Sequence, residues 1–178
     1  MSSAHGPLVV GVTDLLREPG RQRTVERAVP ADRLEVGRSV IDAGVDIDID
    51  LVLESVLGEA VTVRGTVAAP WTGECRRCLE PIAGVLEADV AELYERHPSS
   101  EESFAIVDDA VDLAPVVHDA LVLALPLSPL CRVDCPGPSP DAYPVTVADD
   151  AAQTAARDDR WAALDAVTFD DGEPADGP

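Results

Sequence analysis

The segment Val45-Asp46-Ile47-Asp48-Ile49-Asp50-Leu51-Val52-Leu53-Glu54 is the part of the chain that decides the fold. Apolar and acidic residues alternate strictly from position 45 to position 51. Alternate side chains of a β-strand point to opposite faces, so the pattern predicts a strand with one apolar and one acidic face. Such a strand is typical of an antiparallel sheet that exposes one face to water. We expect the five apolar residues to be buried and the three aspartates to be exposed: Val45, Ile47, Ile49, Leu51 and Leu53, against Asp46, Asp48 and Asp50.

Further strands are expected on both sides of this segment. Leu57-Gly58-Glu59 predicts a hairpin turn, and the alternation of valine with polar residues after it predicts a return strand over residues 60–69. Shorter or less regular strands are expected at residues 8–12, 24–29, 82–94 and 104–107. The end of the long strand that begins at residue 82 also fits a helix, from Ala91 to Arg96.

One main buried helix is predicted over residues 113–125, where apolar residues form a broad band. Asp112 precedes this helix as a cap, and Pro115 stands in its first turn, where a missing N–H does no harm. The sequence therefore predicts an α+β fold: an antiparallel sheet or partly closed barrel, one main buried helix, and a loosely attached C-terminal helical segment.

The composition changes after Cys135, and we expect a domain boundary there. Residues 1–135 are predicted to form the α+β domain. Residues 136–178 are predicted to form a Pro-rich linker, a short helix over 149–166 and a disordered acidic tail from Asp170.

The charge of the chain is strongly one-sided. The 178 residues carry a formal net charge of -21, and all 13 basic residues are arginine. Such a chain repels a phosphate backbone over most of its surface and attracts basic partners, although acidity alone also keeps a protein soluble. No apolar run approaches the ~20 residues of a membrane span. Residues 1–11 lack the features of a signal peptide, so we expect a cytoplasmic protein with no membrane partner.

Four cysteines occur as two closely spaced pairs, Cys75 with Cys78 and Cys131 with Cys135. A C-x2-C turn presents two thiolates to one tetrahedral ion, and a C-x3-C turn can do the same, so the four residues are a candidate structural zinc site. Two other interpretations stay open: four thiols without metal, and a redox switch at Cys75 and Cys78. A thioredoxin-like redox motif needs a βαβ setting, whereas this pair follows a predicted antiparallel hairpin.

The cysteine segments and their surroundings resemble one known family. Cys75-Arg76-Arg77-Cys78-Leu79-Glu80-Pro81 resembles the C-x-R-C-L-x-P signature of the YceD family of large ribosomal RNA subunit accumulation proteins. Four later segments resemble that family's motifs in the same order: residues 111–121, 125–131, 134–137 and 159–164. Family members often carry a second C-x2-C-G pair after the third segment, but residues 138–144 hold no cysteine here. A metal would therefore have to bridge Cys75, Cys78, Cys131 and Cys135.

The resemblance implies a role in the accumulation or maturation of large-subunit (23S) ribosomal RNA. We find no phosphate-binding glycine loop and no Ser/His/Asp set, and the histidines number three: His5, His97 and His118. A non-enzymatic factor is therefore expected, with a basic large-subunit ribosomal protein as its partner. The alternative is direct ribosomal RNA binding through Arg76 and Arg77, helped by the arginine-rich segment 17–38.

Overall fold

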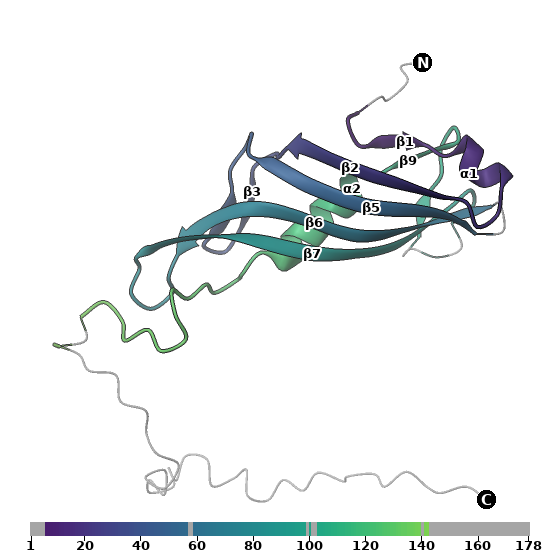
Figure 1. Cartoon of the computed structure of the whole chain (residues 1–178). Helices are drawn as coiled ribbons and strands as arrows, with labels where there is room; N and C mark the ends of the chain where they lie inside the picture. Colours follow the sequence, from purple (N-terminus) through teal and green to yellow (C-terminus); the bar gives the residue numbers. More distant parts are fainter. Residues whose placement is uncertain (1–5, 57–58, 99, 101–102, 140, 143–178) are drawn as a thin grey trace, which may run out of the picture.

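The computed structural model describes residues 6–56, 59–98, 100, 103–139 and 141–142 of the chain (Figure 1). The expected helix over 149–166 and the expected tail lie outside the described residues, as do Leu57 and Gly58 of the expected turn. In chain order the elements are β1 (Val9–Gly11), α1 (Thr13–Arg17), β2 (Gln22–Pro30), β3 (Leu34–Val36), β4 (Ser39–Ile41), β5 (Asp46–Val56), β6 (Ala60–Glu74), β7 (Pro81–Glu95), β8 (Phe104–Ala105), β9 (Ala110–Asp112) and α2 (Ala114–Ala124).

Most strands join one sheet, with β6 at its centre. One side of β6 pairs first with β5 and then with β4, while its other side pairs with β7 along the whole strand. The strand order is β2-β5-β6-β4-β3, and β8 lies beside β7 as the one parallel neighbour among the described pairs. A separate two-stranded sheet joins β1 to β9.

The sheet is open among the described residues, so the first of the two predicted forms, an antiparallel sheet, is found, and a barrel is not shown. Barrel closure requires the two outer strands to pair. In the part of the chain that the structure describes, β2 pairs only with β5 and does not meet β7. Helix α2 packs against β6 and β7 and covers one face of the sheet (Figure 1). The α+β class is confirmed, as an open antiparallel sheet with α2 on one face.

The acidic alternation forms β5 as predicted, apart from its first residue. Ile47, Ile49, Leu51 and Leu53 are buried, and the three aspartates are exposed on the other face. Val45 is only half-buried and precedes the strand, because its N–H and carbonyl are used in a turn with Asp42 and Ala31. The register Val56↔Ala60 confirms the hairpin between β5 and β6.

Both strands of the β6–β7 hairpin are longer than predicted, and residues 91–95 are strand rather than helix. The sequence suggested that β6 ends before Pro70. Even-numbered residues of β6 point their backbone groups toward β5, and pairing with β5 ends at Ala68↔Asp48. Pro70 also points toward the β5 side, where none of the described strands pairs with it. The lack of an N–H at Pro70 therefore costs no ladder hydrogen bond, and β6 continues to Glu74.

The core fills the inner face of the sheet with aliphatic side chains, and α2 adds Val116, Val117 and Leu121 to it. Tyr94 of β7 is 1% exposed, and its hydroxyl donates a 2.7 Å hydrogen bond to the carbonyl of Asp112, two residues before α2 begins. Burial raises the pKa of Tyr94. This contact fixes the start of α2 against the sheet.

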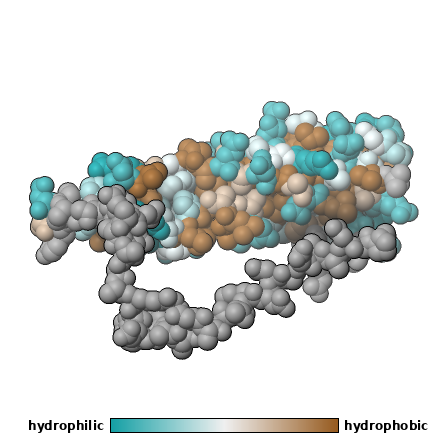
Figure 2. All heavy atoms as spheres, turned by 90° about the horizontal axis from the view of Figure 1, so that it is seen from below, coloured by the Kyte–Doolittle hydropathy of each residue, from teal (hydrophilic) through white to brown (hydrophobic). Residues whose placement is uncertain are grey.

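A few large apolar side chains remain exposed among the described residues: Val56, Leu79, Val85, Val107, Leu123, Leu127 and Val133. Figure 2, which views the molecule from below, shows apolar residues gathered left of centre and hydrophilic residues toward both ends. Among the described residues, no helix combines the length and apolar character that crossing a membrane requires.

Candidate metal centre

The first cysteine pair lies in the turn that joins β6 to β7. Cys75 follows the last residue of β6, and its N–H donates to the carbonyl of Glu80, which continues the ladder by one pair. The carbonyl of Cys75 accepts a 2.9 Å hydrogen bond from the N–H of Leu79. Leu79 has a φ of 63°, in the left-handed region that few non-glycine residues adopt. The resulting tight turn directs the sulfurs of Cys75 and Cys78 to the same side.

The second pair is delivered by the segment that follows α2. Ser39 of β4 is fully buried, and its hydroxyl donates a 2.6 Å hydrogen bond to the carbonyl of Pro126. A Cβ atom on Gly37 would stand 2.9 Å from the carbonyl oxygen of Leu127, so the segment passes closely over the β3–β4 hairpin. A 3.1 Å hydrogen bond from the N–H of Cys135 to the carbonyl of Arg132 then closes the second cysteine turn.

Two hydrogen-bonding groups of the first turn hold the second turn in place. The backbone N–H of Arg76 donates to the carbonyl of Pro129 at 2.9 Å. The guanidinium Nη1 of Arg77 donates to the carbonyls of Val133 and Cys135, both at 3.1 Å. The sequence made Arg77 a candidate RNA contact in the alternative prediction and gave no sign of these hydrogen bonds, since their acceptors are backbone atoms more than fifty residues away.

The four sulfurs converge as a tetrahedral metal site requires. The distance from Sγ of Cys75 to Sγ of Cys135 is 3.8 Å, the distance from Cys78 to Cys131 is also 3.8 Å, and all four sulfurs lie within 4.8 Å of one another. Zn–S bonds of ~2.3 Å in a tetrahedron place sulfurs about 3.8 Å apart. Four thiolates are a donor set suited to zinc, so the residues present fit this ion.

The surroundings of the four sulfurs favour the thiolate form of Cys75 and disfavour the thiolate form of Cys131. Hydrogen bonds from the backbone N–H groups of Cys78, Cys131 and Arg77 outweigh desolvation and lower the pKa of Cys75 to about 5. The neighbouring Cys135 sulfur, desolvation and the two other sulfurs raise the pKa of Cys131 to about 12. A bound divalent cation would relieve this crowding of negative charge and hold all four thiolates together.

Burial divides the cluster into an inner and an outer half. Cys75 and Cys135 are buried, Cys78 is half-buried and Cys131 is exposed. Cys75 and Cys78 lie in the turn of an antiparallel β-hairpin rather than at a βαβ crossover, and the second turn lies in the irregular segment after α2. The setting matches that of a structural metal site with one side open to solvent.

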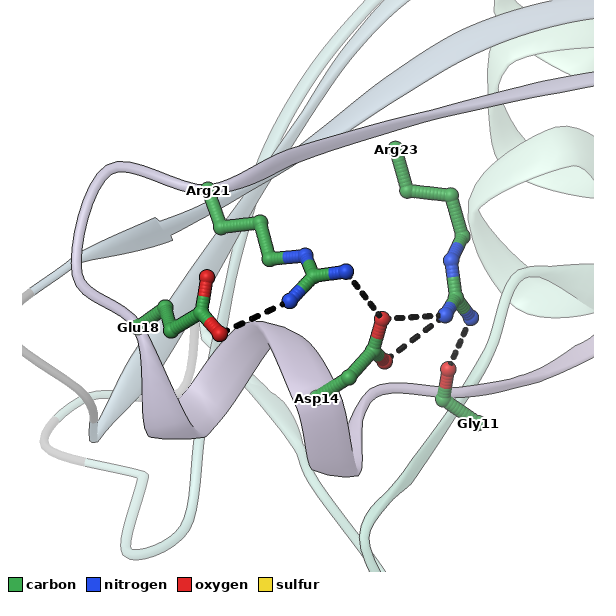
Figure 3. Close-up of polar contacts among 5 residues, drawn as sticks. All are labelled: Gly11, Asp14, Glu18, Arg21 and Arg23. Carbon is green, nitrogen blue, oxygen red and sulfur yellow. Dashed lines mark hydrogen bonds and ion pairs between the residues drawn. The ribbon is translucent and has the colours of Figure 1, made fainter.

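Most arginine side chains of segment 17–38 bond to carboxylates or carbonyls of the same chain. Arg23 makes a bidentate contact with Asp14 at 2.7 Å and also reaches the carbonyl of Gly11, while Arg21 pairs with Asp14 and Glu18 (Figure 3). Desolvation opposes ionisation of Asp14, but the charge and hydrogen bond of Arg23, a backbone hydrogen bond and the charge of Arg21 together outweigh it and lower the pKa of that carboxyl. Further along the segment, three arginines bond to acids or a carbonyl: Arg27 to Pro7, Arg33 to Glu35 and Asp42, and Arg38 to Glu74.

Replacing Arg77 with Ala should weaken zinc binding about 10- to 100-fold, the range found when a group that positions metal ligands is removed. The guanidinium fixes the carbonyls of Val133 and Cys135, and its loss frees the second turn. Competition with a chromogenic chelator measures the change. Arg76→Ala is the matched control, because it removes the same charge one residue away and keeps the backbone N–H. Equal zinc affinities of the two variants would show that Arg77 does not position the ligands.

Comparison with known proteins gives one family and several relatives. The family model described as large ribosomal RNA subunit accumulation protein YceD matches residues 63–167. Uncharacterized proteins of Mycobacterium tuberculosis (strain ATCC 25618 / H37Rv) and Mycobacterium bovis are each 38% identical over 167 residues, which cover 89% of this chain and 80% of theirs. An uncharacterized protein of Mycobacterium leprae is 36% identical over 139 residues, covering 74% of this chain and 64% of its own. No solved structure matches the chain.

Proposed function

The chain belongs to the YceD family of large ribosomal RNA subunit accumulation proteins, and from this premise we propose that it is a non-enzymatic factor that binds a basic protein of the large ribosomal subunit. In this role it would support accumulation of the 23S ribosomal RNA by holding that protein before or during assembly.

The charge of the chain is the observation that carries this proposal. A formal net charge of -21 attracts an Arg- or Lys-rich protein and repels naked RNA. The attraction between exposed charges acts within a Debye length of ~8 Å at physiological salt, so it favours a partner that docks against an acidic surface.

Such an acidic surface lies on the outer face of the sheet, opposite α2. The register places Glu26 of β2 directly opposite Asp50 of β5. On the other side of Asp50 lies Thr66 of β6, and beyond Thr66 lies Asp89 of β7. Like charges directly opposite each other destabilise a sheet. A hollow of about 390 Å³ lies on this face, with Glu26, Asp48, Asp50 and Thr66 among its lining residues. A basic partner would offset the repulsion among these carboxylates.

The metal centre supports the same function as a structural element. Zinc bound by Cys75, Cys78, Cys131 and Cys135 would lock the segment after α2 onto the end of the β6–β7 hairpin. The hydrogen bonds from the Arg77 guanidinium and from the N–H of Arg76 already hold the two cysteine turns next to each other. A redox role for Cys75 and Cys78 lacks the βαβ setting that it would need.

Direct RNA binding is the second candidate, and it rests on Arg76. Its side chain is exposed at the turn tip, and no ion pair to it occurs among the described residues, whereas Arg77 bonds to carbonyls and Arg132 pairs with Asp134 at 3.4 Å. One exposed guanidinium offers phosphate contact at a single point, against a large opposing net charge.

The Arg76→Ala variant separates the two candidates. Binding to a basic large-subunit protein should change less than twofold, since the positive charge of Arg76 does not attract a basic partner. Any binding to 23S RNA should weaken, and its logarithmic salt slope should fall by about one unit. Arg96→Ala removes one exposed guanidinium outside segment 17–38, at the end of the β6–β7 hairpin away from the cysteine turn, and should leave both interactions unchanged. Filter binding and fluorescence anisotropy over a salt series measure both; a protein interaction lost in Arg76→Ala alone contradicts the proposal.

A further inference from the structure

The sheet has one long edge with no partner strand. β7 pairs with β6 from Pro81↔Glu74 to Glu95↔Ala60, and on its other edge it meets β8 only at Tyr94 and Glu95. Within the described residues, no other strand and no turn or loop backbone bond reaches positions 81–93 of this edge.

The register shows which backbone groups point outward along this edge. The carbonyl of Glu95 accepts a 2.8 Å hydrogen bond from the N–H of Ile106, on the side away from β6. The pairing with β6 has no bulge, so the backbone N–H and carbonyl of every second residue from Glu95 back to Pro81 also point away from β6. Pro81 agrees with this alternation, because the position of its missing N–H then lies on the open edge, where no hydrogen bond to β6 is lost. The outward-pointing residues that keep both backbone groups are Ala83, Val85, Glu87, Asp89, Ala91 and Leu93.

These outward positions are accessible to a partner. Five of them are exposed, Val85 at 74%, and Leu93 alone is half-buried. Natural proteins cover or interrupt a strand edge of this length, because its free N–H and carbonyl groups are a template for another chain. The view from below looks toward β7, the lowest labelled strand of Figure 1, and shows apolar residues gathered on that side (Figure 2).

The charge beside the edge selects the partner. The side chains of Glu87 and Asp89 lie on the outer face, and across β6 from them stand Asp48 and Asp50 of β5. A second copy of this chain paired edge to edge would bring further acids against these four. A strand with Lys or Arg at alternate positions would place its basic side chains on the same face, opposite Glu87 and Asp89.

We propose that the outer edge of β7, from Ala83 to Leu93, binds an extended basic segment of a partner protein by strand addition. The inference rests on the proposed function, because it names the surface that receives the basic client. Backbone hydrogen bonds to the open edge supply affinity, and the carboxylates of Glu87 and Asp89 supply the preference for basic side chains.

Hydrogen exchange on the full-length chain tests the edge itself. In the free protein the outward amides of Val85, Glu87, Asp89 and Ala91 should exchange at least about tenfold faster than the amides of Leu86, Ala88 and Val90, which bond to β6. Addition of a labelled peptide of about ten alternating Lys and Val residues should slow the outward amides selectively. Outward amides that are already protected in the free chain would mean that another segment or a second copy occupies the edge, and would overturn the proposal.

Variants test the two recognition elements separately. Ala91→Pro removes one outward N–H and leaves the β6 ladder intact, so it should weaken binding of the Lys/Val peptide about fivefold. Ala91→Thr, which keeps the N–H, should bind as the wild type does. Glu87→Gln with Asp89→Asn should weaken binding about fivefold at low salt. The control, Asp32→Asn with Glu59→Gln, removes two exposed charges elsewhere and should have little effect.

A peptide arm keeps the test valid if a protein variant fails to fold. The same peptide with N-methyl groups at alternate residues keeps its charge but loses edge hydrogen bonds, and it should bind the wild type at least about tenfold more weakly. Equal binding of both peptides overturns strand addition. Basic large-subunit proteins that bind Ala91→Pro and the wild type equally overturn the edge but leave the proposed function standing. Failure of every such protein to bind the wild type counts against the proposed function.

Discussion

Replacing Cys135 with Ser should abolish stoichiometric zinc binding. The wild-type chain is expected to bind one zinc ion, because two pairs of its sulfurs stand 3.8 Å apart and all four lie within 4.8 Å of one another. Loss of one thiolate should weaken affinity on the order of a hundredfold or more, given the binding free energies of four-ligand zinc sites. At free zinc a thousandfold above the dissociation constant, the metal adds about 4 kcal/mol to the wild-type stability. Mass spectrometry under native conditions and thermal unfolding with and without chelator measure both effects.

Val133→Ser is the control for this experiment. Val133 lies between Cys131 and Cys135 and is 87% exposed, so the substitution changes the same turn without removing a ligand. It should bind one zinc ion and lose stability on chelation as the wild type does. A wild-type chain with no bound zinc, and no response to chelator, would leave the four cysteines as free thiols.

Replacing Gly65 with Ala should destabilise the fold by about 3 kcal/mol or more, in the range of the most damaging single substitutions. Gly65 has a φ of 147°, and a Cβ atom there would stand 2.1 Å from the carbonyl oxygen of Asp50 and 2.9 Å from Cα of Leu51. Both obstacles belong to the backbone of β5, which cannot move without breaking the pairing at the centre of the sheet. Urea unfolding at equilibrium measures the loss.

Gly44→Ala separates the cost of backbone conformation from that of the steric clash. Gly44 also has a positive φ, 85°, but among the described residues other than its chain neighbours no heavy atom lies within 4 Å of the position of its Cβ. This variant should lose about 1–2 kcal/mol. If both variants lost the same stability, close approach of β5 at Gly65 would not be the reason for glycine there.

The sequence predicted those elements whose pattern is local. The alternation in β5 specified its buried face, and valine alternation specified the start of β6. The hairpin β3–β4 escaped prediction, because each strand has three residues, too few for an alternating pattern to be recognised. Its role is visible only in three dimensions, where Ser39 anchors the segment that carries the second cysteine pair.

The candidate site shows the same limit. The spacing of the cysteines indicated two turns that could each bind a metal, but not that the turns meet. Cys78 and Cys131 are 53 positions apart, and their approach depends on α2, β4 and the carbonyl of Pro129 together. The alternative prediction made Arg77 an RNA contact, because only its charge is visible in sequence; its carbonyl acceptors become apparent only in the folded chain.

The claim that the chain binds a basic large-subunit protein is tested most directly by titrating the purified full-length protein with separated large-subunit ribosomal proteins and with naked 23S RNA. The measurement belongs at an ionic strength of about 0.15 M, where exposed charges are screened beyond ~8 Å. We expect at least one basic ribosomal protein to bind with a dissociation constant of about 1 μM or tighter, and the RNA to bind at least about a hundredfold more weakly. Tight binding of the RNA, with no affinity for any of the proteins, would contradict the account.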